Sequence, residues 1–355
     1  MMAAKDFLGH GALNLDLIYE IESLDILKAA GFVLAPGREI TGGHEDAERL
    51  IRLLETCARP VARSGGGSSA NTISALARLG FSAAFLGCVG SDEAGGFILD
   101  SMKGVDTSRV ARAGKSAVCM VILEQGSRDR AMMVVPHDRE QVLVEQDTLS
   151  LLRDARCLHL SSAVTDKGLE GQAGLAGLLR PDQILSFDPG EIYASRGLDG
   201  RILKILKRTD ILFITETELA MFTGKPASGA VEDMLLLMDQ DIVKIKGYHL
   251  FEEAGGPVMV LKRGSRGASV CSARLSVSMP AEPVSHVVDN TGAGDAFNAG
   301  FLAGLFNGKG AADCLRQGAW LAARSLSAFG RDWIRDLCQD QLHSGDLARH
   351  ESHND

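Results

Sequence analysis

The chain has 355 residues, of which 45% are hydrophobic and 23% are charged, the balance of an ordinary globular protein. This composition excludes a disordered chain, which needs low hydrophobicity and high net charge. It also excludes a collagen-like chain, because 40 glycines are accompanied by only 9 prolines and follow no three-residue period. The formal net charge of −9 argues against a general nucleic-acid-binding protein, which would need a basic face.

The cysteines and the N-terminus predict a cytoplasmic protein. None of the 7 cysteines belongs to a C-x-x-C pair, so we expect free thiols in a reducing compartment. The first residues lack the apolar run of a signal peptide, and charges interrupt every apolar stretch before it is long enough to cross a membrane. We therefore expect neither a membrane partner nor a structural metal site.

The first hundred residues predict strands and helices in alternation. The expected elements are a strand at 7–18 with a glycine-rich bend, two helices within 23–58, a turn cluster at 64–71 that opens a helix ending at Leu79, and a strand at 83–89. Asp92 is placed to cap the short helix that follows. Two β-rich runs, 117–123 and 131–135, flank a loop at 125–129 and predict a hairpin.

From Cys157 onward the pattern becomes regular. Short apolar strands are expected at 157–160, 184–187, 211–214 and 258–261, with helical stretches between them and two final helices at 293–306 and 311–329. Strands separated by helices predict a mostly parallel sheet with helices on both faces. Ligands of such sheets bind beyond the carboxyl ends of the strands.

The segment from Asp289 to Phe297, Asp-Asn-Thr-Gly-Ala-Gly-Asp-Ala-Phe, is the strongest chemical signal. Its small residues Gly292, Ala293 and Gly294 open a long apolar helix, whose free N–H groups attract anions such as phosphate. Asp295 would repel a phosphate unless it had a task there, and accepting a proton from an attacking hydroxyl is such a task. The alternative is an ordinary helix acid favoured by the dipole.

Two further patterns indicate hydroxyl binding. Gly66, Gly67 and Asn71 combine flexible backbone with an amide at a helix start, although a tight turn and helix cap would look the same. Asn14 and Asp16 follow the first strand, and a paired amide and carboxylate suit vicinal hydroxyls. A simple turn at the end of a strand is the alternative for this pair.

Other motifs have plainer interpretations. Lys262 precedes Gly264-Ser-Arg-Gly267, which reads as a turn joining two strands. Glu216 and Glu218 open a helix, where acids are favoured.

Two patterns are misleading. Gly114-Lys115-Ser116 resembles the end of a P-loop, but Arg109 stands where that motif requires glycine. A nicotinamide-dependent reductase is disfavoured because no complete dinucleotide-binding glycine fingerprint is present.

Taken in order, these motifs resemble the PfkB carbohydrate kinase family, which includes ribokinase, fructokinase and adenosine kinase. The stretch 66–71 continues into Gly87-x-Val89-Gly90-x-Asp92-x-x-Gly95 and is similar to the N-terminal signature of the family; 289–295 is similar to its C-terminal signature. The resemblance covers about residues 6–330. It implies a ribokinase-like three-layer α/β/α fold at 1–340 with a mostly parallel central sheet, a small β-lid and a polar tail at 341–355. The lid is expected at about 14–22 and 115–137, where it would exclude water from the site.

The resemblance also implies the site residues. It assigns the catalytic base to Asp295 and the anion hole to Gly292, Ala293 and Gly294. It assigns sugar hydroxyl contacts to Asn14, Asp16, Gly66, Gly67 and Asn71. Contacts to ATP are implied for Thr291, Lys262, Gly264, Gly267 and Glu218. Glu218 would hold Mg²⁺ through water, and Asp289 with Thr291 would lie near a K⁺ ion, as in some members.

The chain departs from the family pattern at several positions. Thr215 stands where an asparagine near magnesium is usual, which predicts weakened magnesium handling. Asn290 replaces a common threonine, and Leu321 replaces an asparagine of the last helix. The insert at 23–62 is longer than that of ribokinase and resembles the adenosine-kinase-like bacterial branch.

The leading hypothesis is an ATP-dependent kinase of a sugar or nucleoside. The alternative is a catalytically impaired nucleotide- or sugar-binding regulator of the same fold, suggested by Thr215 and Leu321. The acceptor and the choice between monomer and homodimer stay open. Because some relatives dimerise through their lids, the face with Met120 and Val121 is the expected dimer surface.

Overall fold

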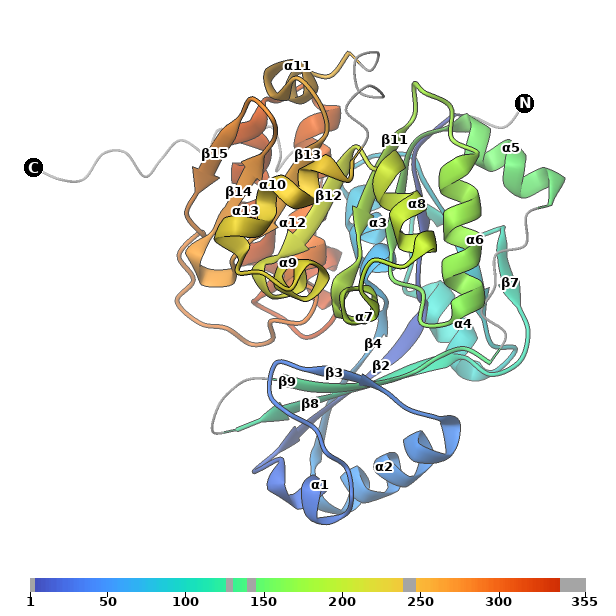
Figure 1. Ribbon diagram of the computed structural model, residues 1–355. Helices are drawn as coiled ribbons and strands as arrows, with labels where there is room; N and C mark the ends of the chain where they lie inside the picture. Colours follow the sequence, from blue (N-terminus) through green and yellow to red (C-terminus); the bar gives the residue numbers. More distant parts are fainter. Residues whose placement is uncertain (1–3, 126–129, 139–144, 239–246, 339–355) are drawn as a thin grey trace, which may run out of the picture.

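The computed structural model describes residues 4–125, 130–138, 145–238 and 247–338. Most of the expected hairpin loop at 125–129 and the whole tail at 341–355 lie outside these ranges. In the described residues, ten strands form one large sheet and five form a small one. Figure 1 shows the small sheet beneath the main body, joined to it by β2 and β4 among others.

The large sheet has the order β15-β14-β13-β12-β11-β10-β1-β5-β6, with β7 also paired to β5. Its strands are β1 (Lys5–His10), β5 (Ala83–Val89), β6 (Val105–Asp106), β7 (Val110–Arg112), β10 (Ala155–Ser161), β11 (Ile184–Asp188), β12 (Ile211–Thr215), β13 (Val258–Lys262), β14 (Ala268–Cys271) and β15 (Ser276–Met279). All neighbours from β13 to β6 pair in parallel, whereas β14 and β15 are antiparallel. The predicted mostly parallel sheet is confirmed.

Helices cover both faces of this sheet because its strands are apolar on both sides. Successive residues alternate between the two cores: Phe213 belongs to one and Ile214 to the other. The first core takes α3 (Ser68–Arg78), α4 (Glu93–Asp100), α11 (His249–Ala254), α12 (Ala293–Phe306) and α13 (Ala311–Ser325). The second takes α5 (Gln146–Asp154), α6 (Asp166–Gly177), α7 (Gly190–Arg196), α8 (Gly200–Arg208), α9 (Glu216–Thr223) and α10 (Ala227–Leu236). The three-layer α/β/α fold is therefore present.

The small sheet has the order β3-β9-β8-β2-β4 and is larger than the sequence predicts. Its strands are β2 (Asn14–Ile21), β3 (Glu39–Thr41), β4 (Arg59–Gly66), β8 (Ala117–Glu124) and β9 (Arg130–Val135). The expected ranges contained β2, β8 and β9 only. β3 is too short for its alternation of apolar and polar residues to predict a strand. The glycines and proline of β4 are typical of a loop, so the sequence does not indicate that strand either.

The helical insert covers one face of the small sheet. Helices α1 (Asp25–Ala29) and α2 (His44–Cys57) lie on its far side in Figure 1, and their leucines pack with Met120 in one apolar cluster. Val121 belongs to another cluster on the opposite face. Both side chains are fully buried, so the expectation of an open dimer surface at Met120 and Val121 is wrong. The alternation of a strand places these neighbours on opposite faces.

The chain crosses between the two sheets at two adjacent places. It leaves β1 for β2 just before Asn14, and it returns from β4 to α3 at Gly67. Asn14 pairs with Gly66 across the small sheet. The expected turn at 64–71 is therefore wrong for 64–66, which belong to a paired strand. It holds at Gly67, whose φ of +103° is in the left-handed region.

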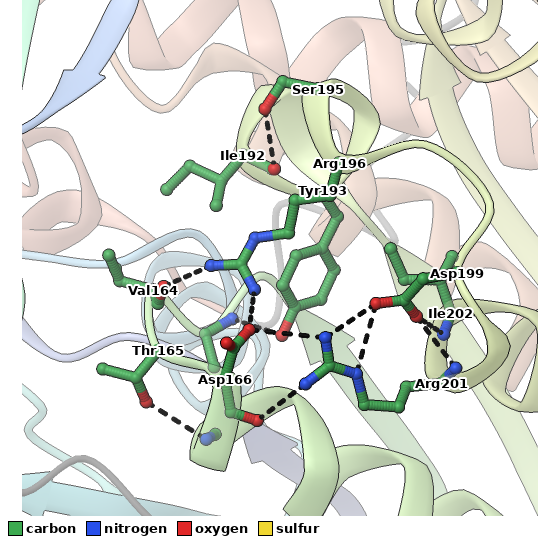
Figure 2. A network of polar contacts seen from close by, with 12 residues as sticks. Val164, Thr165, Asp166, Ile192, Tyr193, Ser195, Arg196, Asp199, Arg201 and Ile202 are labelled. Atoms are coloured by element: carbon green, nitrogen blue, oxygen red, sulfur yellow. Dashed lines mark hydrogen bonds and ion pairs between the residues drawn. The ribbon is translucent and has the colours of Figure 1, made fainter.

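A polar network fixes the loop that follows β10. Figure 2 shows Arg196 of α7 donating to the carbonyl oxygen of Val164 (2.6 Å) and to Asp166 (2.8 Å). The hydroxyl of Tyr193 accepts the backbone N–H of Ala163 at 2.9 Å, and Asp199 caps α8. These bonds tie α6, α7 and α8 together at the carboxyl ends of β10 and β11, where the polar cavity described below opens.

No disulfide joins the seven cysteines, all of which lie in the described residues; five are buried and Cys338 is exposed. In the described part of the chain, none of the helices combines the length and the apolar character that a bilayer crossing requires.

Gly67→Ala should destabilise the junction of β4 and α3. A Cβ there would lie 2.0 Å from the carbonyl oxygen of Ala12, and φ is positive. We expect a loss of more than about 1 kcal/mol in the free energy of unfolding, measured by urea denaturation. The matched control is Gly174→Ala in α6, where nothing lies within 4 Å of the new Cβ; it should gain up to about 1 kcal/mol. Equal effects of the two changes would contradict the assignment of strain to Gly67.

Candidate active site

A cavity of about 600 Å³ lies between the two sheets and gathers most of the predicted site residues. Those that line it are Asn14, Asp16, Gly67, Asn71, Glu218, Lys262, Gly264, Thr291, Gly292, Gly294 and Asp295. Four others do not line it: Gly66, Gly267, Ala293 and Asp289. The cavity is at the carboxyl ends of the parallel strands, where ligands of open α/β sheets bind.

Asp295 lies in the first turn of α12 and is 8% exposed. Its Oδ2 accepts a hydrogen bond of 2.7 Å from Nδ2 of Asn71 in α3. The hydroxyl of Thr72 donates to the Asp295 carbonyl at 3.1 Å. Burial raises the pKa of Asp295 to about 7, although the bond from Asn71 opposes this rise. A carboxyl group that titrates near neutral pH is suited to accept a proton.

The small-sheet side of the cavity carries a second buried carboxyl group. Asp16 accepts a hydrogen bond from Nδ2 of Asn14, and both residues begin β2 rather than end a strand. The alternative of a turn at a strand end is therefore wrong. Burial raises the pKa of Asp16 to about 7, against the effect of the nearby Arg331 cation. Glu39 of β3 also lines the cavity, and burial raises its pKa to about 7.

A buried ion pair lies at the opposite side of the cavity. Nζ of Lys262 donates to Asp188 Oδ2 at 2.6 Å and is 3.5 Å from Asn298 Oδ1. Burial lowers the pKa of Lys262, but the attraction of Asp188 and Glu218 outweighs it and the net shift is upward. The lysine is therefore positively charged. A Cβ at Gly294 would lie 3.4 Å from this ammonium group, which places the charge beside the start of α12.

Gly292 gives α12 its entry. It adopts φ +78° as the N-cap residue, a left-handed conformation that favours glycine. Ala293 is the first residue of the helix and Gly294 the second. The N–H of Ala293 already donates to the carbonyl oxygen of Asn290 at 3.3 Å. The N–H of Gly294 lies in the first helical turn, where such groups lack an i−4 partner and attract anions. Thr291 Oγ1, beside them, is buried without a hydrogen-bond partner among the described residues.

Asp289 stabilises the backbone that leads into α12. Its Oδ1 accepts the N–H of Thr291 at 2.8 Å, and its Oδ2 accepts the N–H of Gly330 at 3.2 Å. The acid that opens the signature thus joins two loops. Gly66 and Gly267 are structural in position. Gly66 ends β4 opposite Asn14, where a Cβ would meet the carboxyl group of Asp16. Gly267 follows the short 3-10 turn η2 (Gly264–Arg266), which links β13 to β14.

Thr215 and Glu218 form a capping box at the start of α9. The Thr215 hydroxyl accepts the N–H of Glu218 at 3.2 Å, and Glu218 Oε2 accepts the N–H of Thr215 at 2.8 Å. Glu218 lines the cavity, and burial raises its pKa. Among the described residues, no three metal-ligating side chains are grouped. A single carboxylate at the cavity, that of Glu218, fits magnesium, because this ion keeps several of its waters and binds substrate phosphates with one or two carboxylates.

Sequence reasoning missed three residues here: Asp188, Glu39 and Arg331. Asp188 ends β11, so the rule that ligands bind beyond strand ends would have found it. Glu39 belongs to the short unpredicted strand β3. Arg331 lies outside every motif, and no signal in the sequence identifies it. The departure at Leu321 lies in the apolar core, fully buried in α13.

Comparisons with known proteins found relatives both by sequence and by fold. Residues 57–332 match the pfkB family carbohydrate kinases. An uncharacterized sugar kinase of Archaeoglobus fulgidus is 34% identical over 259 residues, 72% of this chain and 95% of the relative. An ATP-dependent ribose-1-phosphate kinase of Halopiger xanaduensis is 31% identical over 281 residues, 75% of this chain and 84% of the relative. The crystal structure of adenosine kinase from Sinorhizobium meliloti shares the fold, with a TM-score of 0.75 at 20% identity over 93% of this chain and 96% of that chain.

The match runs from the end of α2 to the start of η3 (Asp332–Asp336) and includes Asn71, Lys262 and Asp295, whereas Asn14, Asp16 and Glu39 precede it. The expected kinase activity on a carbohydrate or nucleoside, with ATP as phosphoryl donor, is supported by the same relatives. The chain belongs to the pfkB family of carbohydrate kinases.

Proposed function

We propose that this kinase phosphorylates a hydroxyl of a small sugar or nucleoside with Asp295 as the general base. The observation that carries the proposal is one buried carboxyl group, with a pKa raised to about 7 by burial, at the N-terminus of α12. Its position lets it face an acceptor hydroxyl, while the amides of Gly292 and Gly294, which line the cavity, would face the incoming phosphoryl group. Ala293, expected in the same anion hole, does not line the cavity.

The acceptor would lie on the small-sheet side of the cavity. Asn14, Asp16 and Asn71 offer amide and carboxylate groups to its hydroxyls, and Gly67 lets the backbone approach. Val121, Met132 and Val134 supply an apolar wall. No aromatic side chain lines the cavity among the described residues, so nothing there would stack on a nucleobase. This favours a sugar over a nucleoside.

The phosphoryl group would lie between Asp295 and Lys262. The acceptor oxygen gives its proton to Asp295 and bonds to the γ-phosphorus of ATP, while the bond to the β-phosphate oxygen breaks and ADP leaves with its electrons. Lys262 would balance the negative charge of the phosphates. Gly264, at the strand end, and the unpartnered hydroxyl of Thr291 would contact ATP.

Glu218 is the residue that we assign to magnesium, through a bound water. When present, the ion neutralises charge on the phosphates. Both carboxylate oxygens of Asp289 accept backbone N–H groups. These bonds do not test the expected potassium site at Asp289 and Thr291, which stays a prediction. Likewise, the weakened magnesium use expected from Thr215 stays a prediction.

The activity test is ADP release from ATP and magnesium across a panel of acceptors: ribose, ribose 1-phosphate, fructose, 2-keto-3-deoxygluconate, adenosine, inosine and cytidine. We expect one sugar to give a signal well above the rate without acceptor. Silence across the panel with ATP still bound would favour the impaired regulator instead, and would make Thr215 the first residue to restore to asparagine.

Asp295→Asn should lower turnover about 10²–10⁴-fold, the usual contribution of a general base. Wild-type kcat/KM should fall as pH drops below about 7, because Asp295 must be ionised. The residual activity of the variant should fall less steeply, because Asp16, whose pKa is also raised to about 7, still titrates at the acceptor site. The matched control is Asp313→Asn, which removes a half-buried acid from the first turn of α13, outside the cavity, and should leave turnover unchanged. Retention of most activity by Asp295→Asn would remove Asp295 from this role.

Asp16→Ala should raise the acceptor KM about 10–100-fold, since it removes a charged hydrogen-bonding group. ATP hydrolysis without acceptor should stay the same. Glu20→Ala is the control, because Glu20 lies on the same strand but pairs with Arg59 outside the cavity. An unchanged acceptor KM in Asp16→Ala would exclude Asp16 from the acceptor site.

A further inference from the structure

Arg331 is a buried cation directly behind the proposed acceptor site. It precedes η3 and is 7% exposed. Its Nε donates to Asn71 Oδ1 at 2.6 Å, its Nη1 to the Ser101 hydroxyl at 2.9 Å, and its Nη2 to the Gly66 carbonyl at 2.9 Å. Burial lowers the pKa of Arg331, but only to about 10, so the guanidinium stays charged at neutral pH.

The contact with Asn71 decides which way its amide points. A guanidinium only donates hydrogen bonds, so it pairs with the oxygen of an amide and never with the NH₂ group. With Oδ1 held by Arg331, Nδ2 must face the other way. There it donates to Asp295 Oδ2 at 2.7 Å. Arg331, Asn71 and Asp295 therefore form a directed chain of hydrogen bonds.

The backbone around Arg331 is also fixed. Its N–H donates to the Ser64 hydroxyl at 3.0 Å, and the preceding Gly330 donates to Asp289 of the signature. One side chain thus connects the end of β4, the first turns of α3 and the residue that follows α4. This arrangement holds the guanidinium in place before any substrate arrives.

Arg331 does not line the cavity that holds Asp295. It lines a second cavity, of about 520 Å³, formed by β4, α3, α4 and η3. Four further basic residues line that second cavity: Arg63, Arg78, Lys103 and Arg335. A substrate between the two sheets would therefore meet Asn71 and Asp295, with Arg331 hidden behind them.

We propose that Arg331 is a positioning residue for phosphoryl transfer: it orients the amide of Asn71 so that Nδ2 holds the Asp295 carboxylate toward the acceptor hydroxyl. The inference rests on the proposed role of Asp295. Small misalignments of a reacting group are costly in rate, so the effect belongs in kcat.

The charges around Asp295 predict a second consequence. Asp188 raises the pKa of Asp295, and Asp16 and Glu39 are further carboxyl groups within electrostatic reach of it. Lys262 lowers this pKa, and Arg331 also interacts favourably with Asp295. Removing Arg331 takes away one of these two cations and frees the Asn71 amide. The fall in activity at low pH should then move to higher pH.

The primary test compares Arg331→Ala with the wild type on the acceptor identified by the panel. We expect kcat to fall about 10–100-fold, with a smaller change in acceptor KM, and the acid limb of the pH profile to shift upward. Arg335→Ala is the matched control, since Arg335 borders the same second cavity and pairs with Asp332. An Arg331→Ala variant with wild-type kcat and pH profile would overturn the inference.

The second cavity allows a sharper test. Truncation at Arg331 leaves a guanidinium-sized gap that opens toward this cavity, so methylguanidinium added to the solution should restore turnover of Arg331→Ala in a saturable way. Urea or sodium chloride at equal concentration should not. Saturable rescue supports orientation by the guanidinium. A folded variant that methylguanidinium does not rescue, with an unshifted pH profile, would indicate a structural role and contradict the proposal.

A double-mutant cycle checks the route of the effect. If Arg331 acts through Asn71, then Asn71→Ala combined with Arg331→Ala should have nearly the same kcat as Asn71→Ala alone. Additive losses would contradict this route.

Should Arg331→Ala be recovered unfolded, Arg331→Lys takes its place. This variant keeps the positive charge but loses the planar guanidinium group, and we expect a lower kcat. An unchanged kcat would overturn the inference.

Failure of the proposed function and failure of the inference about Arg331 give different experimental results. If the wild type phosphorylates no acceptor, or Asp295→Asn stays active, the proposed function is wrong. If the wild type is active and depends on Asp295 while the Arg331 variants behave as the wild type, only the inference about Arg331 is wrong.

Discussion

The hydrogen bond between Asn71 and Asp295 is the contact on which the candidate site depends. It joins residues 224 positions apart in the chain and fixes α3 against α12 at the point where both helices begin. Thr72 adds a second bond to the backbone of Asp295. The residues that we propose for the acceptor lead into α3, and those that we propose for the phosphates lead into α12, so this junction sets their relative position. The fold brings the two signatures together here.

The site also confines opposite charges in a small buried volume. Asp16, Glu39 and Asp295 have pKa values raised to about 7, chiefly by burial. The cations near these groups include Lys262 and Arg331, which act on Asp295, and Arg130, which lowers the pKa of Glu39. Buried carboxyl groups with raised pKa values are a mark of functional sites, and they cost stability that the surrounding sheets and helices must offset.

Much of this arrangement follows from the sequence, because its signals are local. The parallel strands appear as short apolar runs, and Asp92 and the start of α12 appear as helix-start signals. The C-terminal signature locates Asp295 because small residues and an acid at a helix start have few other uses. By contrast, β3 and β4 are held by pairing with distant strands, and their own residues favour loops. Arg331 could not be predicted, since its role depends on Asn71 and Gly66, which only the folded chain brings near.

The pairing of Lys262 with Asp188 has a consequence for turnover. The ammonium group has a carboxylate partner before any phosphate arrives, held in turn by Asn298 at 2.5 Å. When a phosphate leaves, Lys262 therefore still has a carboxylate partner. A buried cation without any partner would be strongly unfavourable. In the proposed mechanism Lys262 interacts both with Asp188, which is always present, and with the nucleotide phosphates, which come and go. The ion pair with Asp188 therefore weakens the attraction of Lys262 for nucleotide. Such moderation favours release of ADP over retention of the product complex.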